Sequence, residues 1–187
     1  MNYVILAAGI GSRLYPYTKN FPKCLVNISE NESILERCIR MIRKYDKASN
    51  IIVVTGFQKE KVIEKSKSCI HIHNPFYRVT NSIASLWFTK NEVLKSKEDL
   101  VIINADIVYD DALAKIICSK PKKSSIFYDS SIKSVGDYNV RVCDSKIVVM
   151  GKELTEYDGE YAGISKIKNS DIKTTFEQID DLVDNDL

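Results

Sequence analysis

Three short apolar runs rich in β-branched residues constrain the fold of this chain most strongly: "YVIL" at 3–6, "IIVV" at 51–54 and "LVII" at 100–103. None of them alternates polar with apolar residues, and unbroken runs of this kind are typical of parallel strands that are covered on both faces. Between the first two runs, segment 32–46 has apolar residues at helical spacing, with charged residues on the opposite side. The order strand, helix, strand predicts βαβ units and a sheet that lies between two layers of helices.

The rest of the chain adds elements of both kinds. "YNVRV" and "KIVVM" flank the turn "CDS" and predict a hairpin, and "EYAGISKI" predicts another strand. Shorter patterns predict a helix near 58–66, a strand at 69–72, a helix that begins near Asn81 and a last helix from about residue 170. We therefore expect an α/β protein with a Rossmann-like, three-layer α/β/α architecture and a mixed, mostly parallel sheet.

Size and composition exclude several classes of protein. The 187 residues suffice for one domain with a sizeable core, and the net charge of +2 with no long basic run gives no indication of a nucleic-acid partner. No apolar stretch approaches the roughly 20 residues that span a bilayer, and no signal peptide is expected. The five cysteines form no CxxC pair, so we expect reduced thiols, a cytoplasmic location and no zinc site. The sequence leaves open whether the chain forms a homodimer.

The segment after the first run, "LAAGIGSRL" at residues 6–14, has the features of a phosphate-binding loop. Gly9 and Gly11 let backbone N–H groups approach an anion closely, and Arg13 can bind phosphate oxygens bidentately. Leu14 stands where the dinucleotide fingerprint requires glycine, and no Gly-Lys-Ser/Thr of a P-loop follows. Lys23 in "FPKCL" adds a second cation, so the pattern predicts a site for a triphosphate.

Two further segments follow strands at the same edge of the predicted sheet. Loop 7–14, "TGF" at 55–57 and "NAD" at 104–106 all come after strands, and open α/β sheets bind ligands beyond the carboxyl ends of their strands. Asp106 ends an apolar strand, where a carboxylate suits Mg²⁺, which takes one or two carboxylates and leaves sites for substrate phosphates. Capping of the next helix is the alternative role for Asp106, but Asp110 and Asp111 are better placed for it.

These segments together resemble a known family. The pattern LAAGxGSRL, followed by Pro16, Thr18, Pro22, Lys23 and Leu25, is similar to the signature of sugar-phosphate-type (MobA-like) nucleotidyltransferases. The resemblance continues through "VTGFQKE", "INAD", "GK" and "GEYAGI" and spans almost the whole chain. The stretch "NPFYRVTNSIASLW" looks most like the branch that transfers CMP from CTP to phosphocholine, phosphoethanolamine or 2-aminoethylphosphonate.

The resemblance implies the nucleotide-diphospho-sugar transferase fold, Mg²⁺-dependent transfer with release of pyrophosphate, and a set of site residues. It implies that Arg13, Lys23 and Asp106 are catalytic and that Asp106 binds the metal. The backbone at Leu6, Ala7 and Ala8 would hold the base and ribose, and Gly9, Gly11, Ser12 and Arg13 would hold the phosphates. The remaining assignments are Lys23 for the α-phosphate, Gly56, Asn81, Ser82 and Ser85 for the pyrimidine, and Lys152 and Glu160 for the acceptor.

Several alternatives stay open. A sugar-1-phosphate nucleotidyltransferase using UTP, dTTP or GTP, and a catalytically weak nucleotide-binding module, both fit the same motifs. Members of the family usually continue to an acidic segment with a second metal carboxylate, so we expect residues 1–187 to be one domain that lacks this C-terminal segment. The acids of the tail are expected on the solvated face of a helix: Asp180, Asp181, Asp184 and Asp186.

Aromatic side chains are the remaining candidates for binding an acceptor. A quaternary ammonium group is recognised by an aromatic cage. Each candidate could instead be an ordinary residue of the core or of the rim of the site. The candidates are Tyr77, Trp87, Tyr109, Tyr128, Tyr138, Tyr157 and Tyr161.

Overall fold

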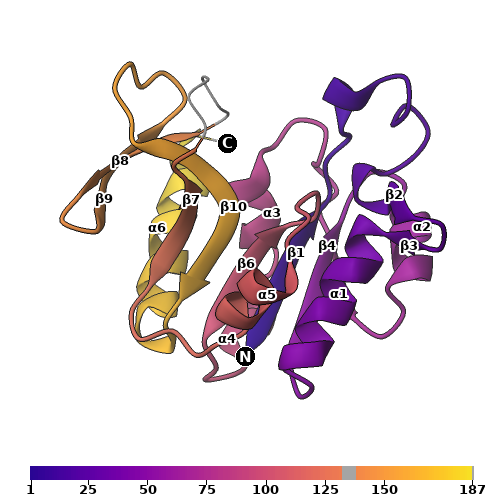
Figure 1. Cartoon of the computed structure of the whole chain (residues 1–187), viewed down its shortest axis with the longest axis horizontal. Coiled ribbons are helices and arrows are strands. Elements are labelled where there is room, and N and C mark those ends of the chain that lie inside the picture. Colours follow the sequence, from indigo (N-terminus) through magenta and orange to yellow (C-terminus); the bar gives the residue numbers. More distant parts are fainter. Residues whose placement is uncertain (132–137, 187) are drawn as a thin grey trace.

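The computed structural model describes residues 1–131 and 138–186 and has one large sheet with helices on both faces (Figure 1). Four parallel strands make up half of this sheet, in the spatial order β5-β4-β1-β6. They are β1 (Asn2–Ala7), β4 (Asn50–Thr55), β5 (Ile70–His73) and β6 (Leu100–Asn104). All three apolar runs are therefore strands, and they pair in parallel as their composition predicts.

The other half of the sheet is antiparallel. Strand β10 (Gly159–Ile167) pairs with β6, and the predicted hairpin of β8 (Asn139–Cys143) and β9 (Lys146–Gly151) continues the sheet beyond β10. Strand β7 (Ser125–Asp129) also pairs with β10 and was not predicted from the sequence. The mixed, mostly parallel sheet is confirmed.

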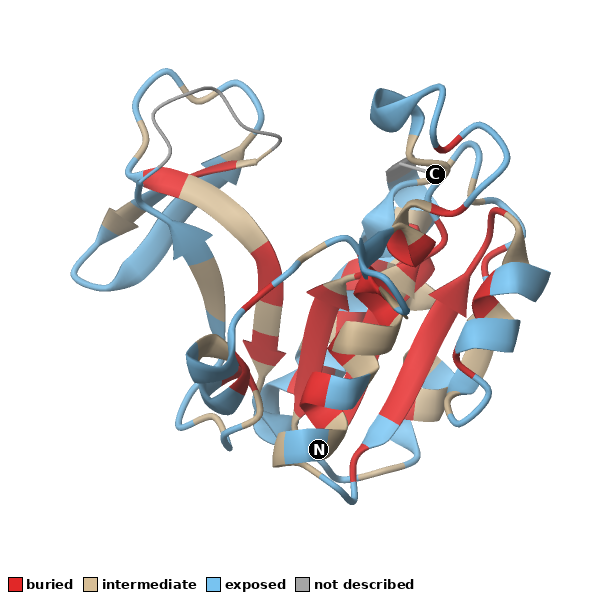
Figure 2. Cartoon of the chain, turned by 45° about the vertical axis from the view of Figure 1, so that its right-hand side comes forward, coloured by how far each residue is buried: buried red, intermediate tan, exposed pale blue. Residues whose placement is uncertain are grey.

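Helices cover both faces of the sheet, because successive strand residues point to opposite sides. In β1, Tyr3 and Ile5 join the core under α1 (Ile34–Tyr45), α2 (Lys59–Lys65) and α5 (Asp111–Ile117). Val4 joins the core under α3 (Ser82–Trp87), α4 (Lys90–Leu94) and α6 (Asn169–Asp186). The central parallel strands β1, β4 and β6 are buried almost throughout, whereas the edge strand β5 is not (Figure 2). The three-layer architecture is confirmed.

Side-chain caps explain where several helices begin. The Asp110 carboxylate accepts from the N–H of Leu113 and caps α5, as predicted, but Asp111 lies in the first turn and binds Lys44 and Tyr45 instead. Two short segments also form ahead of α1: the small hairpin β2 (Asn27–Ser29) and β3 (Glu32–Ser33).

The last helix corrects one prediction about the tail. Asp181 and Asp184 are exposed, as expected. The Asp180 carboxylate instead accepts from the indole N–H of Trp87 at 2.9 Å and pairs with the ammonium of Lys90. This pairing fixes α6 against α3 and α4, and the Lys90 ammonium holds the pKa of Asp180 below its usual value. The side chain of Asp186 lies outside the described residues.

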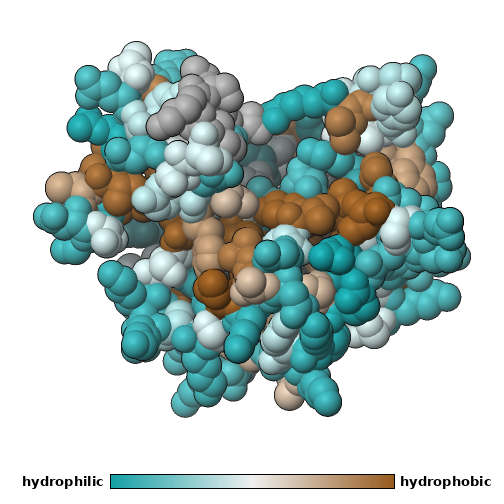
Figure 3. Space-filling view, viewed as in Figure 1, coloured by the Kyte–Doolittle hydropathy of each residue, from teal (hydrophilic) through white to brown (hydrophobic). Residues whose placement is uncertain are grey.

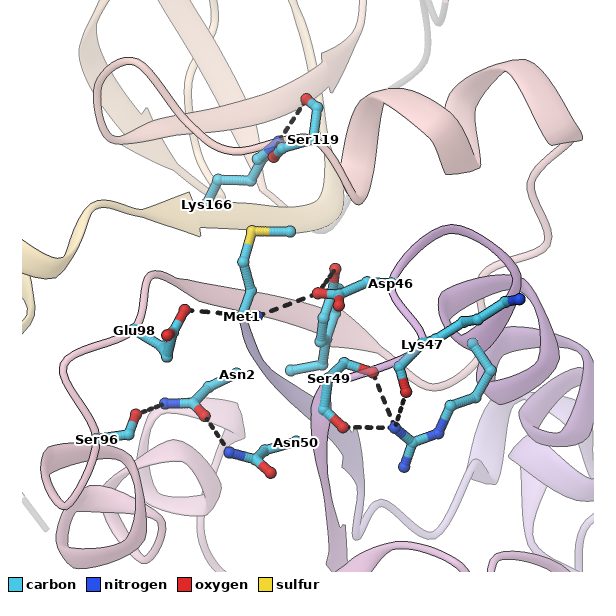
Figure 4. Close-up of polar contacts among 12 residues, drawn as sticks. Met1, Asn2, Asp46, Lys47, Ser49, Asn50, Ser96, Glu98, Ser119 and Lys166 are labelled. Carbon is cyan, nitrogen blue, oxygen red and sulfur yellow. Dashed lines mark hydrogen bonds and ion pairs between the residues drawn. The ribbon is translucent and has the colours of Figure 1, made fainter.

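Polar contacts fill the amino end of the sheet (Figure 4). The N-terminal amine of Met1 donates to Asp46 at 3.1 Å, and the hydroxyl of Tyr3 donates to the same carboxylate at 3.2 Å. The buried Lys166 ammonium donates to the carbonyl oxygens of Ile116 and Ser119 at the end of α5. These contacts close this end of the sheet.

Strand β10 bends where its pairing changes. Residues Ile164–Ile167 pair with β6, whereas Gly159 and Glu160 pair with β8. Gly163 lies between these two stretches with φ +72°, and the register with β7 shifts over the same residues. The bend separates β8 from the end of β6 and leaves space between them.

In the part of the chain that the structure describes, no helix is long and apolar enough to cross a membrane.

Candidate functional site

The loop after β1 is held in shape by residues of its own motif. Gly11 has φ +70°, which favours glycine, and it precedes the short helix η1 (Ser12–Leu14). The buried Thr18 hydroxyl donates to the Gly11 carbonyl at 2.6 Å, and a Cβ at Gly11 would lie only 2.9 Å from the Cβ of Lys23. At Gly9, a Cβ would meet nothing within 4 Å. The loop is thus fixed against Lys23 and open at Gly9.

Backbone hydrogen bonds bring the three strand ends together. The N–H of Ala105 donates to the Leu6 carbonyl, and the N–H of Phe57 donates to the Ala8 carbonyl at 3.0 Å. The result is a cavity of about 380 Å³ at the carboxyl ends of β1 and β6. Its lining includes the predicted metal ligand Asp106. It also includes most of the predicted nucleotide-binding residues: Leu6, Ala7, Ala8, Gly9, Gly11, Ser12, Arg13, Lys23, Asn81, Ser82 and Ser85.

Two of the three charged residues predicted to carry the chemistry, Lys23 and Asp106, are in direct contact. The ammonium of Lys23 lies 2.6 Å from a carboxylate oxygen of Asp106, and the two side chains are 34% and 37% exposed. Asp106 therefore does not cap a helix, since that role belongs to Asp110. A phosphate entering the cavity would meet Lys23, and a cation would meet Asp106.

The residues around Asp106 could hold a divalent cation only together with ligands that the protein itself does not supply. Within residues 1–131 and 138–186, no group of three or more His, Cys, Asp or Glu side chains could hold a metal ion. Mg²⁺ commonly binds one or two carboxylates and takes its other ligands from water and substrate phosphates. One carboxylate beside a phosphate-binding loop fits a cation that binds together with a phosphorylated ligand.

The start of α3 forms a wall of the same cavity. The Asn81 side-chain oxygen accepts from the N–H groups of Ile83 and Ala84, so this oxygen caps the helix. The hydroxyl of Ser85 accepts from the buried amide of Asn74 at 3.0 Å, so Ser85 also supports the wall. These contacts leave the amide nitrogen of Asn81 and the hydroxyl of Ser82 as the donors that this wall can offer.

Gly56 lies outside the cavity lining. A Cβ at this position would be 2.5 Å from the Ala8 carbonyl oxygen and 2.7 Å from the Cβ of Tyr77. The absence of a side chain therefore lets Tyr77 pack against the loop after β1, where Tyr77 lines the cavity. Gly56 shapes the site indirectly in this structure.

A second cavity of about 590 Å³ adjoins the first in the space opened by the bend of β10. In the space-filling view, the loop after β1 rises on one side of a notch that has hydrophobic residues below it (Figure 3). The second cavity contains Glu160, as predicted for an acceptor site, and shares Leu6, Ser82, Asn104 and Asp106 with the first. Lys152 is not part of its lining; its ammonium lies 5.3 Å from the centre of the Tyr138 ring, which does line the cavity.

Two carboxylates face the second cavity from neighbouring strands. Asp129 of β7 and Glu160 of β10 are directly paired in the antiparallel ladder, and both line the cavity. The hydroxyl and the N–H of Ser131 donate to Asp129 and hold its pKa below the usual value, so this group is ionised at neutral pH. Both carboxylates can attract a cationic group of a ligand in this cavity.

The seven candidate aromatic residues do not form one cage. Tyr138 and Tyr161 line the second cavity, whereas Tyr77 lines the first. Trp87 binds Asp180, and Tyr109 is buried against Cys38, so these two rings belong to the core and to helix contacts. Tyr128 and Tyr157 line neither cavity.

Cys24 also lies against the first cavity, beside Lys23, but it is not a reactive thiol. The side chain is 4% exposed, and burial raises the pKa of the thiol to about 12. It is protonated at neutral pH, and thiolate chemistry is excluded for it.

Sequence reasoning missed several lining residues. Thr80 and Asn104 line the first cavity, and Asp129 lines the second. Asn104 stands inside the quoted "INAD" segment, two residues before Asp106, and its position at a strand end was a usable signal. Asp129 had none, because it reaches the site only through the unpredicted strand β7.

Comparisons with known proteins identify the family to which the chain belongs. The family model described as nucleotidyl transferase matches residues 2–139. The chain belongs to the nucleotidyl transferase family. It is thus a nucleotidyltransferase, as the motif around the first cavity implies. The CTP:phosphoglutamine cytidylyltransferase of Campylobacter jejuni is 30% identical to it, and the alignment covers 96% of this chain and 79% of that protein.

Other members of the family are similar over shorter stretches or at lower identity. The choline-phosphate cytidylyltransferase of Haemophilus influenzae is 34% identical over 68% of this nucleotidyltransferase and 52% of its own length, so the chain spans about half of that relative. The solved structure of the CTP:phosphocholine cytidylyltransferase from Streptococcus pneumoniae superposes with a TM-score of 0.76 at 22% identity, covering 97% of this chain and 77% of that chain. This superposition confirms the nucleotidyltransferase fold.

Proposed function

We propose that this nucleotidyltransferase transfers CMP from CTP to a small acceptor that carries a phosphate or phosphonate at one end and a positive charge at the other. Phosphocholine, phosphoethanolamine and 2-aminoethylphosphonate are acceptors of this class. Mg²⁺ is the proposed cofactor, with Asp106 as its ligand from the protein. The names of the cytidylyltransferases to which the chain is similar support the choice of CTP.

The second cavity is the observation that carries the proposed acceptor class. Its charged lining residues are Asp106, Asp129 and Glu160, and no lysine, arginine or histidine of the described chain lines it. The rings of Tyr138 and Tyr161 lie in the same lining. Carboxylates and aromatic faces both attract an ammonium group. A neutral sugar ring would gain no charge attraction from these carboxylates.

In the proposed reaction, an oxygen of the acceptor phosphate or phosphonate attacks the α-phosphorus of CTP. The bond from the α-phosphorus to the oxygen that bridges to the β-phosphate breaks, and pyrophosphate leaves with its electron pair. Lys23 offsets negative charge on the α-phosphate, and Arg13 binds the departing pyrophosphate. Mg²⁺, when bound, supplies further positive charge at the phosphates. The remaining contribution of the protein is positioning of the two substrates.

Two alternatives from other classes remain. A sugar-1-phosphate nucleotidyltransferase would use the same first cavity with UTP, dTTP or GTP. A catalytically weak nucleotide-binding module would bind nucleotide without releasing pyrophosphate. Asp106 is the one carboxylate among the described residues that line the first cavity, and the lack of a second one there favours the last alternative.

Pyrophosphate release tests the proposal directly. The purified chain is assayed with Mg²⁺ and each of CTP, UTP, GTP, ATP and dTTP, in combination with the three cationic acceptors and several sugar 1-phosphates. We expect release with CTP and at least one cationic acceptor. Release only with a sugar 1-phosphate assigns the first alternative, and nucleotide binding without release in any combination assigns the second.

Charge-removing variants test the roles of individual residues. Lys23→Ala and Asp106→Ala should each lower turnover by about 10²–10³, the loss typical of one preorganised electrostatic group. Asp129→Asn should raise the KM for a cationic acceptor about tenfold and leave the KM for CTP unchanged. Asp144→Asn, in the exposed turn of the β8–β9 hairpin, is the matched control. An unchanged acceptor KM in the Asp129→Asn variant would show that the Asp129 carboxylate does not contribute to acceptor binding.

A further inference from the structure

The boundary between the two cavities determines where the proposed transfer can occur. The attacking oxygen of the acceptor must reach the α-phosphorus of the nucleotide, so the reacting atoms meet where the cavities join. The shared lining residues are Leu6, Ser82, Asn104 and Asp106. Asp106 already has a partner in Lys23, and Leu6 is apolar. Ser82 and Asn104 remain as neutral hydrogen-bond donors at the boundary.

The side-chain amide of Asn104 is available for a ligand. Asn104 is the last residue of β6, is half-buried and pairs with Leu6 in the sheet. Among the contacts within residues 1–131 and 138–186, its side-chain amide makes no hydrogen bond. The other asparagines near the site differ: Asn81 caps α3, and the buried Asn74 donates to Thr80 and to Ser85 of α3.

Strand β10 leaves room for this amide. A Cβ at Gly163 would lie 2.8 Å from the amide nitrogen of Asn104 and 2.6 Å from the Cδ1 of Ile107. Gly163 also has φ +72°, a conformation that costs other residues about 1–2 kcal/mol. The strand that forms the wall of the second cavity thus has a glycine at the point where the Asn104 side chain lies.

The charges around the second cavity create a need for such a donor. An acceptor phosphate or phosphonate is an anion, and the cavity that would receive it presents three carboxylates and, among the described residues, no cationic side chain. An amide N–H can bind one oxygen of this anion without a charge of its own. A neutral donor orients the acceptor and leaves the negative charge on the oxygen that attacks.

We propose that Asn104 binds the phosphate or phosphonate of the acceptor and holds it in line with the α-phosphorus, in the space that Gly163 provides. This inference rests on the proposed function and assigns an acceptor-binding residue to it. The amide nitrogen of Asn104 lies beside Gly163, which lines the second cavity and not the first, so its loss should affect the acceptor and not the nucleotide.

Steady-state kinetics and direct binding test the assignment. With the acceptor that supports turnover, Asn104→Ala should raise the acceptor KM at least about tenfold, the range of one hydrogen bond to a charged group. The affinity for CTP, measured by calorimetry, should stay within twofold. Asn104→Asp should raise the acceptor KM at least as much, because it places another negative charge beside the anionic acceptor. Asn104→Ser, which keeps a donor, should recover part of the loss.

The controls separate the possible failures. Asn50→Ala, at the amino end of β4, removes an asparagine of the same sheet far from both cavities and should leave both constants unchanged. An unchanged acceptor KM in a folded Asn104→Ala variant overturns the inference and leaves the proposed function intact. An equal loss of CTP affinity also overturns it, because Asn104 would then belong to the nucleotide. A wild-type chain that neither uses nor binds any phosphorylated or phosphonate acceptor overturns both.

Discussion

The ion pair between Lys23 and Asp106 predicts that one substitution will have opposite effects on metal binding and on turnover. In the nucleotide-free protein, the Lys23 ammonium lies 2.6 Å from a carboxylate oxygen that a divalent cation would use. A cation binding there must displace the lysine and then tolerate its charge. Lys23→Met removes both obstacles, so we expect tighter binding of the cation in the absence of nucleotide.

The magnitude follows from the exposure of the pair. A partly exposed ion pair contributes about 0.2–1 kcal/mol. Two unit charges 4 Å apart interact by about 1 kcal/mol in water, so repulsion between an ammonium and a divalent cation is about 2 kcal/mol. Salt screens part of this sum. The net gain of about 2 kcal/mol corresponds to a tightening of at least about tenfold. Turnover with CTP should fall in the same variant, since Lys23 then no longer faces the α-phosphate.

A manganese titration followed by electron paramagnetic resonance measures the first effect, and pyrophosphate release measures the second. Lys19→Met is the matched control, because it removes the same charge from an exposed position in the same loop. Asp106→Asn should abolish the binding that Lys23→Met improves. Equal manganese affinity in the wild type and in Lys23→Met, both without nucleotide, would refute the idea that the lysine occupies the cation's place.

Three further predictions concern stability and thiol reactivity. Gly11→Ala should lower the free energy of unfolding in urea by about 1–2 kcal/mol, because it forces a side chain into a left-handed backbone at φ +70°; an unchanged value would show that the loop relaxes. Lys166→Leu should lower the free energy of unfolding in the same assay by about 2–3 kcal/mol. The reason is that the side chain of Lys166 is buried, at 4% exposure, and its ammonium donates to two carbonyl oxygens and to the hydroxyl of Ser119. Stability equal to wild type would contradict this. With a thiol reagent at pH 8, Cys143 should react quickly and Cys24, whose pKa is raised to about 12, only after unfolding; mass spectrometry of the labelled sites distinguishes the two.

The parallel half of the fold could be predicted because its signals are local. Unbroken apolar runs mark the strands, and Gly9, Gly11 and Arg13 follow closely after the end of β1 at Ala7. The convergence of loop 7–14 and Asp106 follows from parallel topology alone. For these reasons the first cavity contains nearly all of the residues that the sequence assigned to the nucleotide.

The antiparallel half could be predicted only in part, because it depends on pairing between distant segments. Strand β7 has no turn signal of its own and exists through its contact with β10. Asp129, Asn104 and Gly163 acquire their relation to the second cavity from the bend of β10, which no sequence period encodes. Asp180 showed the same limit: helical periodicity places it on a polar face, and only packing against Trp87 reveals that it holds the helix in place.

The bend of β10 also places the two cavities in parts of the sheet that differ in how tightly they are packed. The first cavity lies at the ends of β1 and β6, two parallel strands whose buried residues are packed on both faces, and such packing resists change. On its outer side, the second cavity is lined by residues of β7 and β10 and by Met150 of the β8–β9 hairpin, and residues 146–150 of the outer strand β9 are exposed. Substitutions in this outer half can reshape the second cavity without repacking the core beneath the first. The same scaffold can therefore exchange one acceptor for another over evolution, or in a directed screen, while its nucleotide chemistry is preserved.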